Sequence, residues 1–332
     1  MSNKALFNQL ELAYAPLTAY EYSTARNDHY IELALEEASL YVIGQRPVIT
    51  FEKVQINSLD KLEFEIHQKG NPNILKCKLP IIQSVFGANE QDNIAIAFNF
   101  LDKSVKGNNK YPLYNIHDFS IYRHKNSENE FLIWFSPEKL LQNWWKGNVD
   151  CEIQGDYKTL LKYKVHYVGK ATKQSILKRL SGHSTFQDIL SLEAPVTEKQ
   201  LPANEIIILS FKFEENIQLQ SFGEDSDIKS MVRAVQGEDY PDQEKVFLDV
   251  EKALISAIKP GYNKELFNNY PKSKDGLYND NYDAISYKFS DPITLTYKEG
   301  EISGGDTPYS SDAIIVLNNS NVRLVKNKSK TQ

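Results

Sequence analysis

The chain has 332 residues, of which 41% are hydrophobic and 25% charged, and its formal net charge is −6. This composition is typical of globular proteins and excludes a disordered or fibrous chain, and the length favours about two domains. The acidic balance also argues against a protein that coats nucleic acid with its whole surface, so any site for a polyanion must be local.

Cysteine content and the start of the chain bear on its compartment. Cys77 and Cys151 are too few and too far apart in the sequence for a zinc knuckle or a disulfide framework, so we expect two reduced thiols. The N-terminus has no basic start followed by an apolar run, and no stretch approaches the ~20 apolar residues of a membrane span. These patterns predict a soluble, cytoplasmic protein without membrane contact.

Residues 1–150 are predicted to form a mixed α+β region, to which we assign no role. Residues 28–44 carry apolar residues at helical spacing and end at Gly44, which predicts an amphipathic helix. Alternating patterns and turn residues predict the other elements of this region. They are a strand over 47–56, a hairpin over 61–79, a strand over 93–101, a strand over 131–135 and a helix that begins at Ser136-Pro137.

The central range, residues 151–268, has a clearer pattern and is predicted to form a separate domain. Its elements are a strand over 163–169, a helix over 173–183, an apolar strand over 205–213, an acidic and mobile-looking stretch over 214–227 and a helix over 242–259 that stops at Pro260-Gly261. The last range, residues 269–332, is predicted to be a β-rich extension with several strands over 285–325 and a basic tail.

Basic residues gather in the central range. Between Lys158 and Phe186 the sequence holds seven basic residues and no acidic one. The seven are Lys158, Lys162, Lys164, Lys170, Lys173, Lys178 and Arg179. In an acidic chain this asymmetry is a candidate polyanion footprint, although a solvated helix face would also explain a run of charge. Arg179 and His183 are four residues apart on one helix face, so both could reach one ligand, and the planar fork of arginine suits a phosphate.

Glu251 lies within the apolar stripe of the helix over 242–259. The stripe consists of Phe247, Val250, Leu254, Ile255 and Ile258. Burying an unpaired charge is prohibitive, so Glu251 must meet a basic side chain, a metal ion or a wet cleft at the edge of the core. The helix alone leaves a structural ion pair and a metal ligand equally open.

Taken together, these segments resemble the GIY-YIG nuclease family. The matching residues are Tyr167, Val168, Gly169 and Arg179 in the first segment, and Glu251, Leu254, Ile255, Pro260 and Asn263 in the second. His183 also occupies a position where the family frequently has histidine. The resemblance rests on the order and spacing of two separate motifs, each with the expected strand or helix, and it covers roughly a third of the chain.

The first motif of the family, Gly-Ile-Tyr, is expected on a strand about ten residues before Tyr167. The nearest candidate is Gly155-Asp156-Tyr157, in which an aspartate replaces the apolar residue. The strand over 131–135, followed by a long insertion, is a second candidate, and Tyr163 is a third. The identity of the first tyrosine therefore stays open.

The resemblance implies an α+β fold with a central α/β sandwich, in which helices flank a small antiparallel sheet. It also implies an endonuclease that hydrolyses phosphodiester bonds in DNA with one divalent cation, Mg²⁺ or Mn²⁺. By resemblance, Glu251 would hold the metal and Arg179 would bind the scissile phosphate. Tyr157 or Tyr167 would accept the proton of the attacking water.

Further residues receive supporting roles from the same resemblance. His183 would position water or phosphate, and Gly169 and Asn263 would support the site. The residues expected to contact DNA, most simply duplex DNA, are Lys170, Lys173, Lys178 and Arg179. The alternatives are a nucleic-acid-binding module that has lost cleavage, and a protein whose flanking regions act in assembly or recognition. The sequence leaves open the target, DNA versus RNA, the biological role and whether the chain forms a homo-oligomer.

Overall fold

The computed structural model describes residues 3–57, 60–101, 111–125, 128–193, 203–224, 226–305, 307 and 310–327. The chain forms two compact units. Unit 1 comprises residues 1–45, 162–193 and 206–332, and unit 2 comprises residues 46–161 and 194–205. The boundaries of these units differ from the predicted domain boundaries after residues 150 and 268. The reason is that strands from residues 1–150, 151–268 and 269–332 all pair in one sheet of unit 1.

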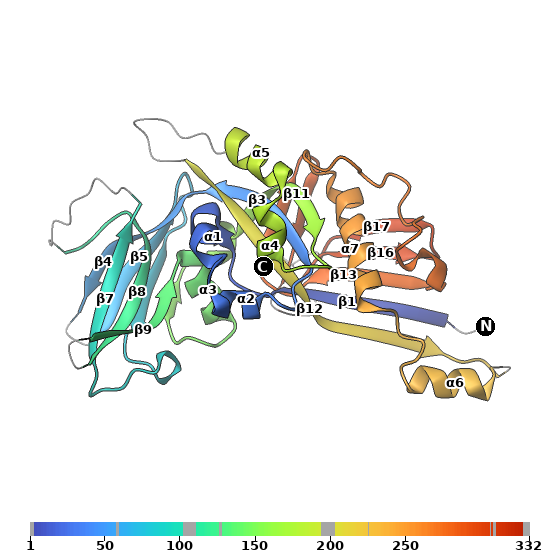
Figure 1. The fold of residues 1–332 in the computed structure, drawn as a ribbon, viewed down its shortest axis with the longest axis horizontal. Coiled ribbons are helices and arrows are strands. Elements are labelled where there is room, and N and C mark those ends of the chain that lie inside the picture. The colour runs from blue at the N-terminus through green and yellow to red at the C-terminus, as the bar shows by residue number, and fades with distance from the viewer. Residues whose placement is uncertain are drawn as a thin grey trace. The chain divides into compact units, whose positions relative to one another are not determined.

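Within the described residues, unit 1 is built on a ten-stranded sheet (Figure 1). The strand order is β15-β14-β11-β3-β12-β1-β13-β16-β17, with β2 paired to β12. The strands are β1 (Asn3–Leu12), β2 (Leu17–Thr18), β3 (Leu40–Pro47), β11 (Lys162–Lys170), β12 (Asn204–Ser221), β13 (Ala284–Phe289), β14 (Thr294–Tyr297), β15 (Gly300–Ser303), β16 (Ala313–Leu317) and β17 (Asn321–Val325). The sheet is larger than the small antiparallel one that we expected, and its pairs β1–β13 and β11–β14 are parallel.

The helices of unit 1 include one long helix that packs against β11. They are α1 (Ala19–Ala25), α2 (His29–Ala34), α4 (Ile176–Ser181), α5 (Ser184–Leu192), α6 (Ile228–Val235), α7 (Gln243–Ile258) and a 3-10 turn, η3 (Leu277–Asp280). Helix α7 begins after the N-cap Asp242 and ends at Lys259, as its capping residue and the following Pro260 predicted. Among the described residues, no helix is both long and apolar enough to cross a bilayer.

The predicted helix over 28–44 is wrong over most of its length. Only His29–Ala34 is helical, and β3 begins at Leu40. Leu40, Tyr41, Val42 and Ile43 are each 0% exposed, so the segment is a strand covered on both faces. The prediction was wrong because a continuous apolar run matches the helical spacing as well as the spacing of a buried strand, so periodicity alone does not distinguish the two.

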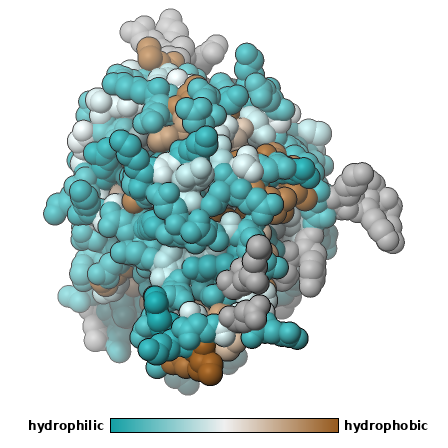
Figure 2. Space-filling model, turned by 90° about the vertical axis from the view of Figure 1, so that its right-hand side faces the viewer, coloured by the Kyte–Doolittle hydropathy of each residue, from teal (hydrophilic) through white to brown (hydrophobic). Residues whose placement is uncertain are grey.

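The acidic stretch over 214–227 is also more regular than predicted. Strand β12 continues through it to Ser221, because it pairs with β1 from Phe211↔Leu12 to Ser221↔Asn3. Helix α6 follows this two-stranded ribbon, as Figure 1 shows, and it buries none of its residues. Figure 2 shows a largely hydrophilic surface with small hydrophobic patches on this side of the molecule. No residue of the ribbon or of α6 belongs to the candidate site described below.

Unit 2 contains, among the described residues, a seven-stranded sheet of order β10-β6-β5-β4-β8-β7, with β9 paired to β8. Its elements are β4 (Ile49–Ile56), β5 (Lys61–Gln68), β6 (Leu75–Pro80), η1 (Ser84–Phe86), β7 (Asn93–Phe100), β8 (Ile116–Lys125), β9 (Glu128–Phe135), α3 (Pro137–Trp145), β10 (Glu152–Gln154) and η2 (Tyr157–Leu160). The predicted hairpin (β5–β6) and the helix capped by Ser136 (α3) are both confirmed.

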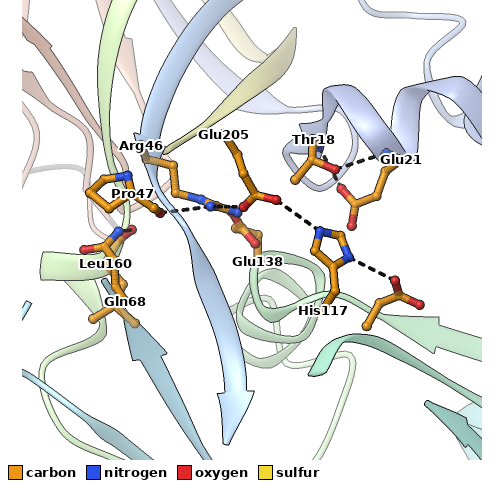
Figure 3. Close-up of polar contacts among 10 residues, drawn as sticks. Thr18, Glu21, Arg46, Pro47, Gln68, His117, Glu138, Leu160 and Glu205 are labelled. Atoms are coloured by element: carbon orange, nitrogen blue, oxygen red, sulfur yellow. Dashed lines mark hydrogen bonds and ion pairs between the residues drawn. The ribbon is translucent and has the colours of Figure 1, made fainter. Parts of the chain in front are cut away.

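A buried polar network lies inside unit 2 (Figure 3). The guanidinium of Arg46 forms ion pairs with Glu138 and Glu205. The imidazole of His117 lies between two carboxylates, 3.2 Å from Glu205 and 3.0 Å from Asp118. Because these side chains are buried, removing one of the charges would leave another buried charge without a counter-charge and would destabilise the fold.

Candidate active site

Strands β3 and β11 bring two tyrosines together. The strands are antiparallel, with Tyr167 opposite Ile43 and Gly169 opposite Tyr41. The rings of Tyr41 and Tyr167 lie with their centroids 6.0 Å apart and their planes at 30°. Tyr41 was not among the candidates for the first tyrosine, because residues 46–161 separate the two strands in the sequence.

Gly169 allows the Tyr41 ring to pass over β11. A Cβ atom at residue 169 would lie 2.6 Å from Tyr167 Cε1 and 2.7 Å from Tyr41 Cζ. No real Cβ atom approaches its neighbours so closely, so a side chain here must push at least one ring away. Glycine at position 169 therefore has a steric reason, and its supporting role in a site stays a prediction.

We expect Gly169→Ala to displace the Tyr41 ring and to lower the free energy of unfolding by about 1–3 kcal/mol. Thermal unfolding monitored by circular dichroism would measure this loss. Gly182→Ala is the matched control, because a Cβ at Gly182 meets no atom within 4 Å. Equal stability of the two variants would contradict the steric role of Gly169.

His183 packs against both tyrosines. Its ring lies edge-on to Tyr167, with centroids 5.0 Å apart, and to Tyr41, with centroids 6.3 Å apart. The residue is the N-cap of α5, where Nδ1 accepts a hydrogen bond from the backbone N–H of Phe186 at 3.2 Å. Burial lowers the pKa of His183, and the positive charge of Arg179 lowers it further. The histidine is therefore a neutral helix cap that supports the two rings.

The stability of the fold should fall below pH 6.5 because of this cap. The pKa of His183 in the folded state lies below the unfolded value of about 6.5, so its contribution is present above that pH and is lost as the pH falls through it. His183→Asn keeps a capping side chain that does not titrate. Between pH 8 and pH 5, the free energy of unfolding should decline less in His183→Asn than in the wild type. An equal decline in the two proteins would contradict the role of His183 in this pH dependence.

The charged residues of the site come from α4, α7 and the end of β11. Arg179 is exposed on α4 and lowers the pKa of Tyr41, Tyr167 and His183, so it lies near all three. Glu251 projects from α7 with 13% of its side chain exposed, and its Oε2 lies 3.3 Å from Lys170 Nζ. Glu251 therefore forms an ion pair with Lys170, the last residue of β11.

Electrostatic coupling joins the tyrosines to this ion pair. Burial raises the pKa of Tyr167, and the negative charge of Glu251 raises it further, whereas Tyr41 and Arg179 oppose the increase. Burial also raises the pKa of Glu251, against the attraction of Lys170. Each charge thus changes the protonation of its neighbours, which is typical of sites that transfer protons.

Tyr41 carries a buried hydroxyl that interacts with the Tyr167 hydroxyl and the Arg179 guanidinium, although it forms no hydrogen bond of regular geometry with a described residue. Burial raises the pKa of this phenol, with a further increase from Tyr167 and a decrease from Arg179. A buried hydroxyl without a regular hydrogen bond calls for an explanation such as a ligand or a water molecule.

Asn263 ties the end of α7 to β11. Its side-chain amide donates to the backbone oxygen of Val168 at 2.8 Å and accepts from the Val168 N–H at 3.0 Å. The N–H of Tyr262 donates to the His166 oxygen at 3.1 Å, beside a β-bulge between Val165 and Tyr167. The bulge interrupts the strict alternation of side chains along β11.

The far side of α7 is fixed by Asp249, which the sequence did not single out. Its buried carboxylate accepts hydrogen bonds from the hydroxyls of Tyr270 and Tyr287, each at 2.7 Å, and from the Leu277 N–H at 2.9 Å. These bonds resist rotation of α7 about its axis and so keep Glu251 directed toward Lys170.

The remaining predicted residues belong to the other unit or are exposed on unit 1. Tyr157 belongs to unit 2, where its ring packs against Trp144 and Trp145 with centroids 5.1 and 6.5 Å away. Lys173 and Lys178 are exposed, Lys178 on α4 beside Arg179. In the described ranges, no three His, Cys, Asp or Glu side chains gather as a metal site.

Comparison of the chain with protein-family models, with curated proteins and with solved structures finds no match. The function must therefore be argued from the residues and their arrangement.

Proposed function

We propose that the protein is a divalent-metal-dependent endonuclease of the GIY-YIG type that hydrolyses phosphodiester bonds in DNA. The observation that carries the proposal is the meeting of Tyr41, Tyr167, Arg179 and Glu251 in unit 1. Ser39-Leu40-Tyr41 resembles the first motif of that family, and its last two residues begin β3, the strand that pairs with β11 and its second motif. On this proposal, Tyr41 replaces Tyr157 as the first tyrosine, and unit 2 is inserted between the two motif strands.

The residues fit a hard divalent cation. Glu251 offers carboxylate oxygens, and its contact with Lys170 indicates that the position beside Oε2 suits a positive charge. Mg²⁺ needs only one or two protein carboxylates, because it keeps several waters and takes substrate phosphate oxygens as ligands. When bound, the cation would supply Lewis-acid activation of water and would neutralise charge on the phosphate.

The residues of this chain would divide the remaining work. Tyr167 is partly exposed whereas Tyr41 is buried, so Tyr167 is placed to accept the proton of the attacking water. The Tyr41 hydroxyl, which interacts with Tyr167 and Arg179, would donate a hydrogen bond to a phosphate oxygen or an ordered water. Arg179 would bind the phosphate and stabilise the charge that develops in the transition state. Exposed Lys173 and Lys178 would bind the DNA backbone.

One observation favours a second candidate, a binding module that has lost cleavage. The pKa of both tyrosines is raised, chiefly by burial, which keeps both phenols protonated in the protein as it stands. A site that binds phosphate through Arg179 without a phenolate would bind DNA and leave it intact.

Cleavage of supercoiled plasmid tests the proposal. We expect nicking with Mg²⁺, none with EDTA, none with Glu251→Gln, and a rate about 10²–10³-fold lower with Arg179→Ala. Arg233→Ala is the matched control, because Arg233 is an exposed arginine of unit 1 on the distant helix α6. Intact plasmid with the wild type, together with salt-sensitive DNA binding, would favour the binding module.

A further inference from the structure

We propose that Lys170 couples cation binding to phosphate binding: its ammonium occupies the cation position at Glu251 in the resting protein and moves to substrate phosphate when a divalent cation enters. The inference rests on the proposed function, because it assigns the cation site to Glu251. It starts from the ion pair between Lys170 Nζ and Glu251 Oε2 at 3.3 Å.

Lys170 and a divalent cation cannot share this oxygen easily. An ammonium in direct contact with Oε2 would lie only a few ångströms from a metal ion on the same carboxylate, and the two positive charges would repel each other. Among the described residues, Lys170 is the cation in direct contact with Glu251, since the neighbouring Lys252 pairs with Asp275 at 2.9 Å. Entry of the metal therefore requires the Lys170 ammonium to leave.

Lys170 can leave because of where it lies. It is the last residue of β11, its side chain is 29% exposed, and four flexible carbons carry its charge. Tyr167, three residues earlier on the same strand, interacts electrostatically with both Glu251 and Arg179, and Arg179 lies on the following helix α4. A displaced ammonium would thus lie near the phosphate that Arg179 binds.

The consequence is reciprocal coupling. A cation that displaces Lys170 adds a positive charge for phosphate, and a phosphate that attracts Lys170 clears the carboxylate for the cation. By linkage, each must strengthen the binding of the other by the same factor. In the absence of nucleic acid, Lys170 lowers the affinity for the cation, so the site stays unloaded until substrate arrives.

Mn²⁺ binding measured by titration calorimetry at pH 8 tests the inference. We expect Lys170→Met to bind Mn²⁺ about tenfold more tightly than the wild type without DNA, because the competing charge is gone. With a phosphorothioate duplex, which resists cleavage, the wild type should gain at least tenfold in Mn²⁺ affinity and Lys170→Met should gain at least threefold less. Glu251→Gln should abolish the binding.

Lys229→Met is the matched control, because Lys229 is an exposed lysine of unit 1 on helix α6 and has no role in the proposed site. It should leave both duplex binding and Mn²⁺ affinity unchanged. Unchanged or weaker Mn²⁺ binding by Lys170→Met would overturn the inference even if the wild type cleaves plasmid. Coupled binding without any plasmid cleavage would instead support the inference and refute the nuclease.

Discussion

Replacing Tyr167 by Phe is expected to lower the rate of plasmid cleavage by about 10²–10⁴-fold, the usual contribution of a general base. The change removes one hydroxyl and keeps the ring that packs against Tyr41 and His183, so the fold should survive. Affinity for duplex DNA should change by less than about threefold, because phosphate contacts come from basic side chains. Single-turnover cleavage and equilibrium binding at the same salt concentration would measure both quantities.

Two other tyrosines provide the comparison. Tyr41→Phe should also slow cleavage, because it removes the hydroxyl that interacts with Tyr167 and Arg179. Tyr157→Phe should leave cleavage unchanged, because that ring packs on Trp144 and Trp145 in unit 2. Loss of cleavage in Tyr157→Phe, with full activity in the other two variants, would refute the pairing of Tyr41 with Tyr167.

The parts of the fold that the sequence predicted well are those with a local cause. The hairpin β5–β6 follows from a turn between two alternating segments, and α3 begins where Ser136 and Pro137 form a cap and a first turn. Helix α7 likewise carries an apolar stripe and ends before Pro260. In each case, neighbours in the sequence contain the information, so single-sequence patterns suffice.

The packing of Tyr41 on Tyr167 could not be found in this way, because it depends on a partner strand far along the chain. The sequence shows an apolar run from Leu40 to Ile43, and only its pairing with β11 distinguishes a covered strand from a helix. The search for a first tyrosine near Tyr167 also assumed a short connection, whereas residues 46–161 form a unit of their own. One signal was available: the triplet Ser39-Leu40-Tyr41, which has a small, an aliphatic and an aromatic residue in the order of the family motif.

Glu251 illustrates a different limit. The apolar stripe showed that its carboxylate needs a partner, but a helix does not reveal what packs against it. The structure supplies Lys170 at the end of β11, so the ion pair that the sequence left open is present, whereas the metal ligand stays a proposal. An ion pair and a cation site need not exclude each other when the pair is accessible and its lysine is flexible.

In unit 2, replacing Arg46 by Met is expected to lower the free energy of unfolding by about 3–5 kcal/mol. Arg46 is 2% exposed and pairs with Glu138 and Glu205. Burial alone would raise the pKa of Glu205, but Arg46 and His117 hold it at about 2, so this carboxylate stays charged at neutral pH. Without Arg46, two buried carboxylates lose their main counter-charge.

Tryptophan fluorescence makes this loss measurable in unit 2 alone, because the three tryptophans of the chain, Trp134, Trp144 and Trp145, all belong to that unit. Arg233→Met serves as control: it removes an arginine that is 58% exposed and paired with Asp239 at 2.7 Å, which should cost less than about 1 kcal/mol. The deficit of Arg46→Met should also shrink toward acidic pH, because Glu205 gives its stabilising charge above its unfolded pKa of about 4.3 and loses it as the pH falls toward 2. An equal effect of the two substitutions at neutral pH would mean that water, and not Arg46, stabilises the carboxylates of Glu138 and Glu205.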